Sequence, residues 1–114
     1  MLEPVAEALF VETAALLPRV VEADGQVWRN LVIPEVEQRA QSLAEFRGRH
    51  RYNHLDDNLR AMYADVPVIA QWDDHETTNN WYPGEILTDP AYDRERRVDV
   101  LARWAKRAWW EWQP

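Results

Sequence analysis

The run Pro67-Val68-Ile69-Ala70-Gln71-Trp72 constrains the fold of this 114-residue chain more than any other segment. It begins with a proline and is rich in β-branched and aromatic residues, which predicts a short buried strand. A buried strand must pair its backbone groups with neighbouring strands. The nearest second candidate, 27–33, lacks a clean alternation and is equally compatible with a turn leading into a helix. The sequence therefore predicts a fragment of an α/β fold whose sheet partners lie on another chain or in a longer parent protein.

The other segments predict helices that pack on this sheet, so that the chain is mostly helical. A helix over 34–48 would begin at a proline and end near a glycine. A shorter helix is expected over 56–65, stopped by the following proline. The Ala- and Leu-rich segment 5–17 predicts another. The longest helix is expected over 90–112, where apolar residues form one stripe.

Several conspicuous residues outside the predicted strand favour structural roles. Four tryptophans crowd the end of the last helix, and we expect them to pack in a core or an interface rather than to stack on a ligand. The basic stretch 94–97 is expected to form salt bridges on a solvated helix face rather than to bind phosphate. His50 and His54 fall in a helical region without ligand-like neighbours, and surface or boundary positions are expected for them.

The turn after the predicted strand gathers acids, an imidazole and amides. Asp73, Asp74, His75 and Glu76 are consecutive, and two asparagines follow at 79 and 80. In open α/β sheets, ligands bind beyond the carboxyl ends of the strands. Carboxylates and imidazole bind cations and carry protons. The turn is therefore a candidate metal site, and the alternative is a solvated polar loop that caps a strand.

Two better-defined metal motifs do not fit this turn. A zinc-protease helix requires His-Glu-x-x-His, and the fifth position here is Asn79. A calcium-binding EF-hand loop that began at Asp73 would require glycine at Thr78.

The block Trp72-Asp73-Asp74-His75-Glu76, followed by Asn79-Asn80-Trp81-Tyr82-Pro83-Gly84, resembles the signature of PhoD-like alkaline phosphatase/phosphodiesterases. Upstream segments resemble the stretch that precedes this signature in the family: 24–30, 43–48, 52–53 and 59–60. The resemblance covers roughly residues 20 to 114. It implies that 1–114 is a partial PhoD-like domain, a fragment of the metallophosphoesterase α/β sandwich.

The resemblance also implies roles for the turn. Asp74 takes the position of a metal ligand, His75 the position that contacts phosphate or acts as general acid, and Glu76 the position that orients the histidine. Aspartate at the ligand position favours hard, highly charged ions, and the family is known for iron and calcium. The implied activity is metal-dependent hydrolysis of phosphate esters by His75 and Glu76.

Three further residues of the turn are candidates for supporting roles. Asp73 is a candidate for contacts behind the metal ligand. Asn79 and Asn80 are candidates for bonds to the substrate or to the loop backbone, and asparagines in tight turns more often satisfy local amides.

The family also draws ligands from an upstream Asp-x-x-Tyr block and a downstream Gly/His block, and neither occurs in this chain. A single loop does not close a two-metal centre. We therefore expect the turn to act within a larger catalytic domain, by self-association or by pairing with a complementary segment. The alternative is a truncated, non-catalytic remnant that serves as an interaction or structural piece. A regulatory calcium-binding module is the least supported option.

Charge and composition narrow the classes of partner. Thirteen basic against twenty acidic residues give a net charge of −7, which argues against nucleic acid. The chain has no cysteine, so neither a disulfide nor a thiolate metal site is expected. It also lacks a membrane-spanning run and a signal peptide, although relatives in this family are commonly exported, so localisation stays open.

Overall fold

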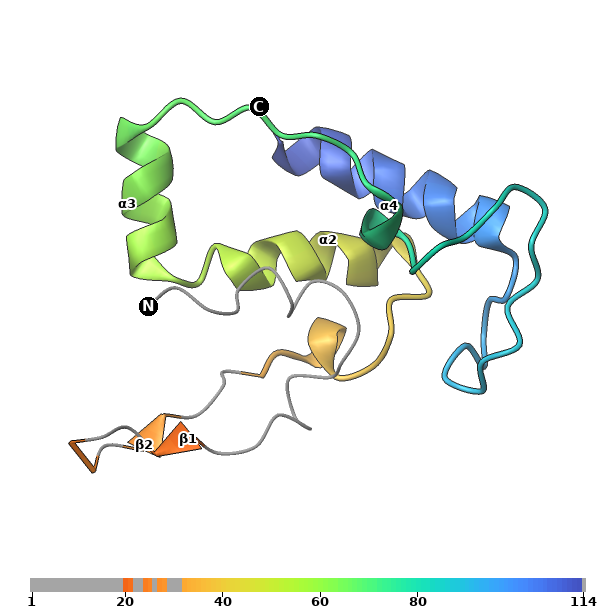
Figure 1. Cartoon of the computed structure of the whole chain (residues 1–114), viewed down its shortest axis with the longest axis horizontal. Helices are drawn as coiled ribbons and strands as arrows, with labels where there is room; N and C mark the ends of the chain where they lie inside the picture. The colour runs from red at the N-terminus through yellow and green to blue at the C-terminus, as the bar shows by residue number, and fades with distance from the viewer. Residues whose placement is uncertain (1–19, 22–23, 26, 29–31, 114) are drawn as a thin grey trace.

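The computed structural model describes residues 20–21, 24–25, 27–28 and 32–113. This part of the chain is mostly helical (Figure 1), and it contains three α-helices, two short 3-10 turns and long irregular segments. The elements are β1 (Val20–Val21), β2 (Val27–Trp28), η2 (Pro34–Val36), α2 (Leu43–Asn53), α3 (Asp57–Asp65), η3 (Asp74–Glu76) and α4 (Val98–Trp112). None of the described helices is both long and apolar enough to cross a membrane.

The prediction of a strand over 67–72 is wrong. The segment is extended, and its exposure alternates: Val68, Ala70 and Trp72 are half-buried while the residues between them face solvent. Ile69 is 98% exposed, so the segment packs on one side only. Within the described residues no strand runs beside it, and an extended segment without a strand partner forms no ladder. The chain was expected to be an α/β fragment with one buried strand. The described residues form a mostly helical fragment without that strand.

A short hairpin is the strand pairing that the structure does contain. β1 and β2 are antiparallel, with Val20 opposite Trp28 and Val21 opposite Val27. Gly25 lies in the connecting turn with φ +82°, a conformation that glycine adopts without strain. The candidate second strand over 27–33 is thus a strand at its first two residues, and 32–33 lie outside any strand.

The helix predicted over 34–48 is in fact two elements. η2 begins at Pro34 and lasts for one turn, and α2 begins only at Leu43. Local capping explains this late start: the Ser42 hydroxyl accepts a hydrogen bond from the Glu45 backbone N–H at 3.2 Å. The Glu45 carboxylate in turn accepts from the backbone N–H of Gln41 at 2.8 Å. Such reciprocal bonds fix a helix amino end.

α2 continues past Gly48, because this glycine is required for close packing rather than for termination. A Cβ atom at Gly48 would lie 2.2 Å from Glu35 Cβ and 2.7 Å from Glu35 Cγ. η2 and α2 therefore touch through a position that holds no side chain.

Gly48→Ala is expected to destabilise the fold by about 1–2 kcal/mol, since overpacking outweighs the helix propensity that alanine adds. Urea unfolding measures the change. In the double variant Glu35→Gly/Gly48→Ala the clash is removed, and the effect of the alanine should reverse in sign. A Gly48→Ala protein as stable as the parent would show that η2 does not rest on this face.

The other two helices begin and end for local reasons as well. The prediction over 56–65 is confirmed by α3, whose Asp56 carboxylate accepts from the Leu59 backbone N–H at 2.8 Å. α4 begins at Val98 rather than near 90, because the chain before it pairs with 85–87. There the Leu87 N–H donates to the Arg96 carbonyl at 2.8 Å. The predicted helix over 5–17 lies outside the described residues.

The core lies between α2 and α4, which run side by side in the same general direction (Figure 1). Fully buried Leu101 of α4 and buried Phe46 of α2 belong to the same apolar cluster. The stripe expected on α4 is buried at Leu101, Ala105 and Ala108, while Trp110 is 66% exposed. α3 contributes no buried residue and stands apart from this core.

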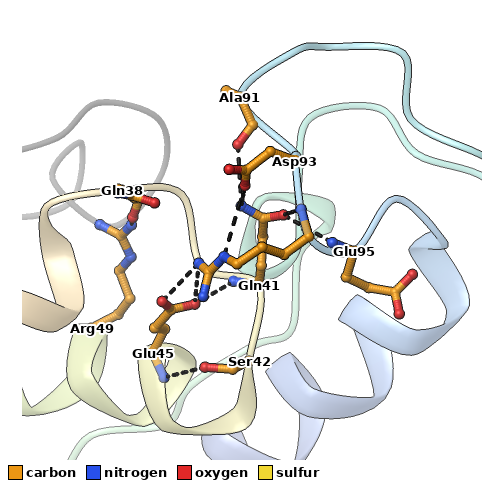
Figure 2. Close-up of polar contacts among 9 residues, drawn as sticks. Gln38, Gln41, Ser42, Glu45, Arg49, Ala91, Asp93 and Glu95 are labelled. Carbon is orange, nitrogen blue, oxygen red and sulfur yellow. Dashed lines mark hydrogen bonds and ion pairs between the residues drawn. The ribbon is translucent and has the colours of Figure 1, made fainter.

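Gln41 joins the start of α2 to the loop that leads into α4 (Figure 2). Its amide nitrogen donates to Asp93 Oδ1 at 3.0 Å and to the Ala91 carbonyl at 3.2 Å. Its amide oxygen accepts from the backbone N–H groups of Arg94 and Glu95 at 2.8 and 3.0 Å. Gln41 is 97% buried, and its side-chain amide can make four hydrogen bonds, two as donor and two as acceptor. All four are formed.

The basic stretch at 94–97 forms the expected ion pairs, but it lies in the loop before α4 and not on a helix face. Arg94 bonds both carboxylate oxygens of Glu45, at 2.8 and 3.0 Å. Arg97 bonds Glu95 at 2.6 Å and lowers the pKa of that carboxyl to about 2.

His50 is buried, contrary to the expected surface or boundary position. Its ring stacks on that of Trp112 with centroids 6.3 Å apart, and the His54 ring lies 5.2 Å from the same indole. Burial lowers the pKa of His50 to about 4, and the neighbouring His54 adds to this effect. The end of α2 thus packs on α4 through a neutral imidazole.

Stability should fall on acidification because of His50. The unfolded chain takes up this proton near pH 6.5 and the folded chain only near pH 4. The full contribution is present well above pH 6.5, and about 3 kcal/mol of it should be lost as the pH falls to 4. Unfolding by urea across this range measures the slope. His50→Phe keeps a ring against Trp112 and should flatten the slope, whereas an unchanged slope would assign the pH dependence to other groups.

Candidate functional site

The candidate site is the turn that ends the extended segment. Three backbone bonds curl it into η3: Glu76 N–H donates to the Asp73 carbonyl, and Thr77 N–H and Thr78 N–H both donate to the Asp74 carbonyl, at 2.9–3.2 Å. Asp73, Asp74 and His75 gather at this turn, and one ligand atom from each lies within 4.8 Å of the others.

The imidazole of His75 stands between the two aspartates. Its Nδ1 atom lies 4.0 Å from Asp73 Oδ2, and its Nε2 atom lies 4.0 Å from Asp74 Oδ1. Within the described part of the chain this is the one cluster of three acids or histidines able to hold a metal ion. His50 lies on α2 and His54 directly follows the helix, and both are outside this cluster.

The turn is anchored to the core by its neighbours. Trp72, directly before Asp73, packs edge-on against Trp109 of α4 with centroids 5.9 Å apart, and it also contacts the central apolar cluster. Thr77, directly after η3, is 91% buried, and its hydroxyl has no hydrogen-bond partner in the structure. The metal-capable side chains therefore project from a backbone that is fixed at both ends.

Residues 79–81 hold the Asp74–His75 pair from the other side. Asn79 Oδ1 lies 2.7 Å from His75 Nε2, and the Asn80 backbone N–H donates to Asp74 Oδ2 at 2.5 Å. The indole N–H of Trp81 donates to the Asp74 carbonyl at 3.1 Å. Asn80 has φ 52°, so the chain turns back at this residue. Each of the residues 79–81 thus forms one hydrogen bond to either Asp74 or His75.

Electrostatic interactions within the turn shift the pKa values of its titratable groups in different directions. The hydrogen bond from the Asn80 backbone is the main cause that lowers the pKa of Asp74. The bond to Asn79 and the three nearby carboxylates raise the pKa of His75. Burial and the charge of Asp73 raise the pKa of Glu76. Near neutral pH, Asp74 is therefore ionised, and His75 holds its proton to a higher pH than an ordinary imidazole does.

All six residues singled out in the sequence lie on this one loop. Asp73, Asp74 and His75 converge, and Asn79 and Asn80 bind two of them. Glu76 is half-buried and outside the convergent group, and it acts on the His75 ring through its charge. Sequence reasoning missed the role of Trp81. An indole N–H usually finds an acceptor when it is partly buried, and this was the available signal.

Comparison with known proteins places the chain in a family. Residues 13–114 match the PhoD-like phosphatase family, which is most of the chain. The chain belongs to the PhoD-like phosphatases. A 40-residue stretch is 42% identical to alkaline phosphatase D of Bacillus subtilis (strain 168). No solved structure matches the chain.

The matched stretch covers 35% of this chain and 7% of alkaline phosphatase D, so the chain aligns with a small part of that longer protein. The family resemblance deduced from the Asp74–His75–Glu76 signature is thereby confirmed.

Proposed function

We propose that residues 1–114 are a partial PhoD-like domain that acts within a larger catalytic domain. Its Asp74–His75–Glu76 turn contributes to metal-dependent hydrolysis of phosphate esters, of the alkaline phosphatase/phosphodiesterase D type. The convergence of Asp73, Asp74 and His75 within 4.8 Å, in a chain of this family, is the observation that carries the proposal.

The residues present fit a hard cation. The two carboxylates offer oxygen ligands, and Asp74 has the lowered pKa that keeps its carboxylate charged. Asp74 would be the ligand, with Asp73 at its side. Iron and calcium suit these donors, and both are the family's metals by resemblance. A cation bound here would neutralise phosphoryl charge and lower the pKa of an attacking water.

The remaining chemistry belongs to His75 and its neighbours. When water attacks phosphorus and the P–O bond of the ester breaks, the alcohol leaves as an alkoxide that needs a proton. His75 retains a proton at a pH where an ordinary imidazole has lost it. Its proton would pass to the leaving oxygen. Glu76 supports the charged ring electrostatically, since its carboxylate raises the pKa of His75. Asn79 and Asn80 keep the ring and the carboxylate in place.

The described turn supplies ligands from one side only. A two-metal centre needs ligands on both sides of ions that lie about 4 Å apart. We therefore place the turn in a site completed by further segments, through association with a complementary piece or with a second copy. The exposed face of α3 and the open side of 67–72 are surfaces that such an association would cover.

Hydrolysis of p-nitrophenyl phosphate and bis-p-nitrophenyl phosphate at alkaline pH, with added iron and calcium, tests the proposal. His75→Ala and Asp74→Ala are each expected to abolish the turnover, because one removes the group that contacts and stabilises the phosphoryl group and the other removes the metal ligand. Arg97→Ala is the matched control, since Arg97 pairs with Glu95 at the surface, away from the turn. Its activity should equal that of the parent.

Two outcomes would contradict the proposal. Turnover retained in His75→Ala would remove this residue from the mechanism. No turnover with any metal, in the chain alone or joined to the rest of a PhoD-like domain, would favour the non-catalytic remnant.

A further inference from the structure

We propose that residues 54–71 form a hinged arm, which is held at one angle by the stacking of the Tyr63 ring on the His54 ring. The arm comprises α3 and the segments on either side of it. It stands at the edge of the molecule, apart from the packed pair of α2 and α4 (Figure 1). The inference goes beyond the proposed function and does not rest on it.

The arm contributes no buried residue to the core. No residue from 54 to 76 is buried, whereas Asn53 before this stretch and Thr77 after it both are. The large apolar side chains of the arm that face solvent are Leu55, Met62, Val66 and Ile69. A segment with few buried apolar contacts opens at a lower free-energy cost than a packed core does. The arm is therefore able to move as a unit while α2 and α4 stay packed.

Two side chains of α3 reach back to His54 at the end of α2. The rings of Tyr63 and His54 stack with centroids 5.4 Å apart and with their planes 8° apart. The exposed Arg60 guanidinium donates to the His54 carbonyl at 2.7 Å. Water competes for a hydrogen bond at the surface, whereas stacked rings also bury apolar area. The ring stack is therefore the contact that holds the arm.

His54 is itself fixed to the core, so it gives Tyr63 a firm support. Its Nδ1 atom lies 2.8 Å from the His50 carbonyl oxygen. Its ring also meets the indole of Trp112 in α4, with centroids 5.2 Å apart, and the His50 ring stacks on the same indole. Tyr63 thus joins α3 to rings that belong to α2 and α4. The stack sets the angle between α2 and α3.

The carboxyl end of the arm lies just before the candidate turn. Trp72 packs edge-on against Trp109 of α4, with centroids 5.9 Å apart. From Val66 to Gln71 the chain is outside any helix or strand, and among the described residues no strand runs beside it. A few residues of such irregular segments absorb hinge motions. The arm can therefore change its angle when a further segment docks, while the turn at 73–76 keeps its place.

The angle of the arm is measurable with spin labels, because the chain has no cysteine. Labels on Ala61→Cys in α3 and Lys106→Cys in α4, both at exposed positions, report the distance between the two helices by double electron–electron resonance. The parent arm should give one narrow distance distribution. Tyr63→Ala should broaden it at least about twofold, because the ring that holds the arm is lost. The helix itself should persist, since alanine is the best helix former.

Two further variants act as controls. Tyr63→Phe keeps the ring and should keep the narrow distribution. Met62→Ala truncates the exposed side chain next to Tyr63 and should also leave the distribution narrow. A broad distribution in the parent, a narrow one in Tyr63→Ala, or a Tyr63→Phe arm as broad as that of Tyr63→Ala would overturn the inference. Because the labels report no turnover, a chain without hydrolytic activity but with a Tyr63-dependent arm would contradict the proposed function and support this inference.

Discussion

Leu101→Ala is expected to lower the free energy of unfolding by about 2 to 5 kcal/mol, the range for truncating a buried leucine. Leu101 is fully buried in the apolar core. The same cluster contains Phe46 and Tyr92, whose rings have rigid shapes and would fill the vacated space poorly. Urea unfolding followed by tryptophan fluorescence measures the change, because Trp104 packs against the same cluster.

Ile69→Ala is the matched control for this experiment. Ile69 is an aliphatic residue of the same size that is 98% exposed, so its truncation should change the stability by less than about 0.5 kcal/mol. A large effect at Ile69 would mean that the open side of 67–72 is covered in solution. Equal small effects at both positions would mean that α2 and α4 do not share a packed core.

The sequence predicted helices well where local signals coincide with the tertiary contacts. α3 has a capping aspartate at its start and a proline after its end, and it occupies the predicted residues. α4 shows the limit of periodicity. The apolar stripe of the helix was recognised in the sequence, but its first residue was not. The backbone pairing of 85–87 with 96–98 makes the helix start later, and the spacing of residues along the chain does not reveal this pairing.

The segment 67–72 shows why composition alone does not make a strand. β-branched and aromatic residues favour an extended backbone, and the segment is extended. A strand also requires a neighbour, and neighbours come from the rest of the fold. Among the described residues no neighbour is present, so the apolar Ile69 stays in solvent. The observed exposure is consistent with the proposed place of the chain in a larger domain.

The sequence predicted which residues form the candidate site, but it did not predict how their side chains contact one another. Asp73, Asp74 and His75 are adjacent in sequence, so their proximity was expected. The partner of His75 was not, because the resemblance pointed to Glu76 and the structure places Asn79 at the ring. Only the positive φ of Asn80 and the curl of η3 bring the amide there, and neither is encoded in residue type alone.

Gln41→Ala is expected to destabilise the fold by about 2–3 kcal/mol, because it removes four hydrogen bonds from a buried side chain. The backbone N–H groups of Arg94 and Glu95 would lose their acceptor, so loop 91–95 should open before the rest of the molecule. Limited proteolysis should then cut the variant within this loop, and urea unfolding gives the magnitude. Gln38→Ala, at an exposed glutamine three residues away, should change neither measurement. Because loop 91–95 leads into α4, and α4 supports Trp72 beside the candidate site, a loop that stayed closed in Gln41→Ala would show that α4 is positioned by its apolar stripe alone.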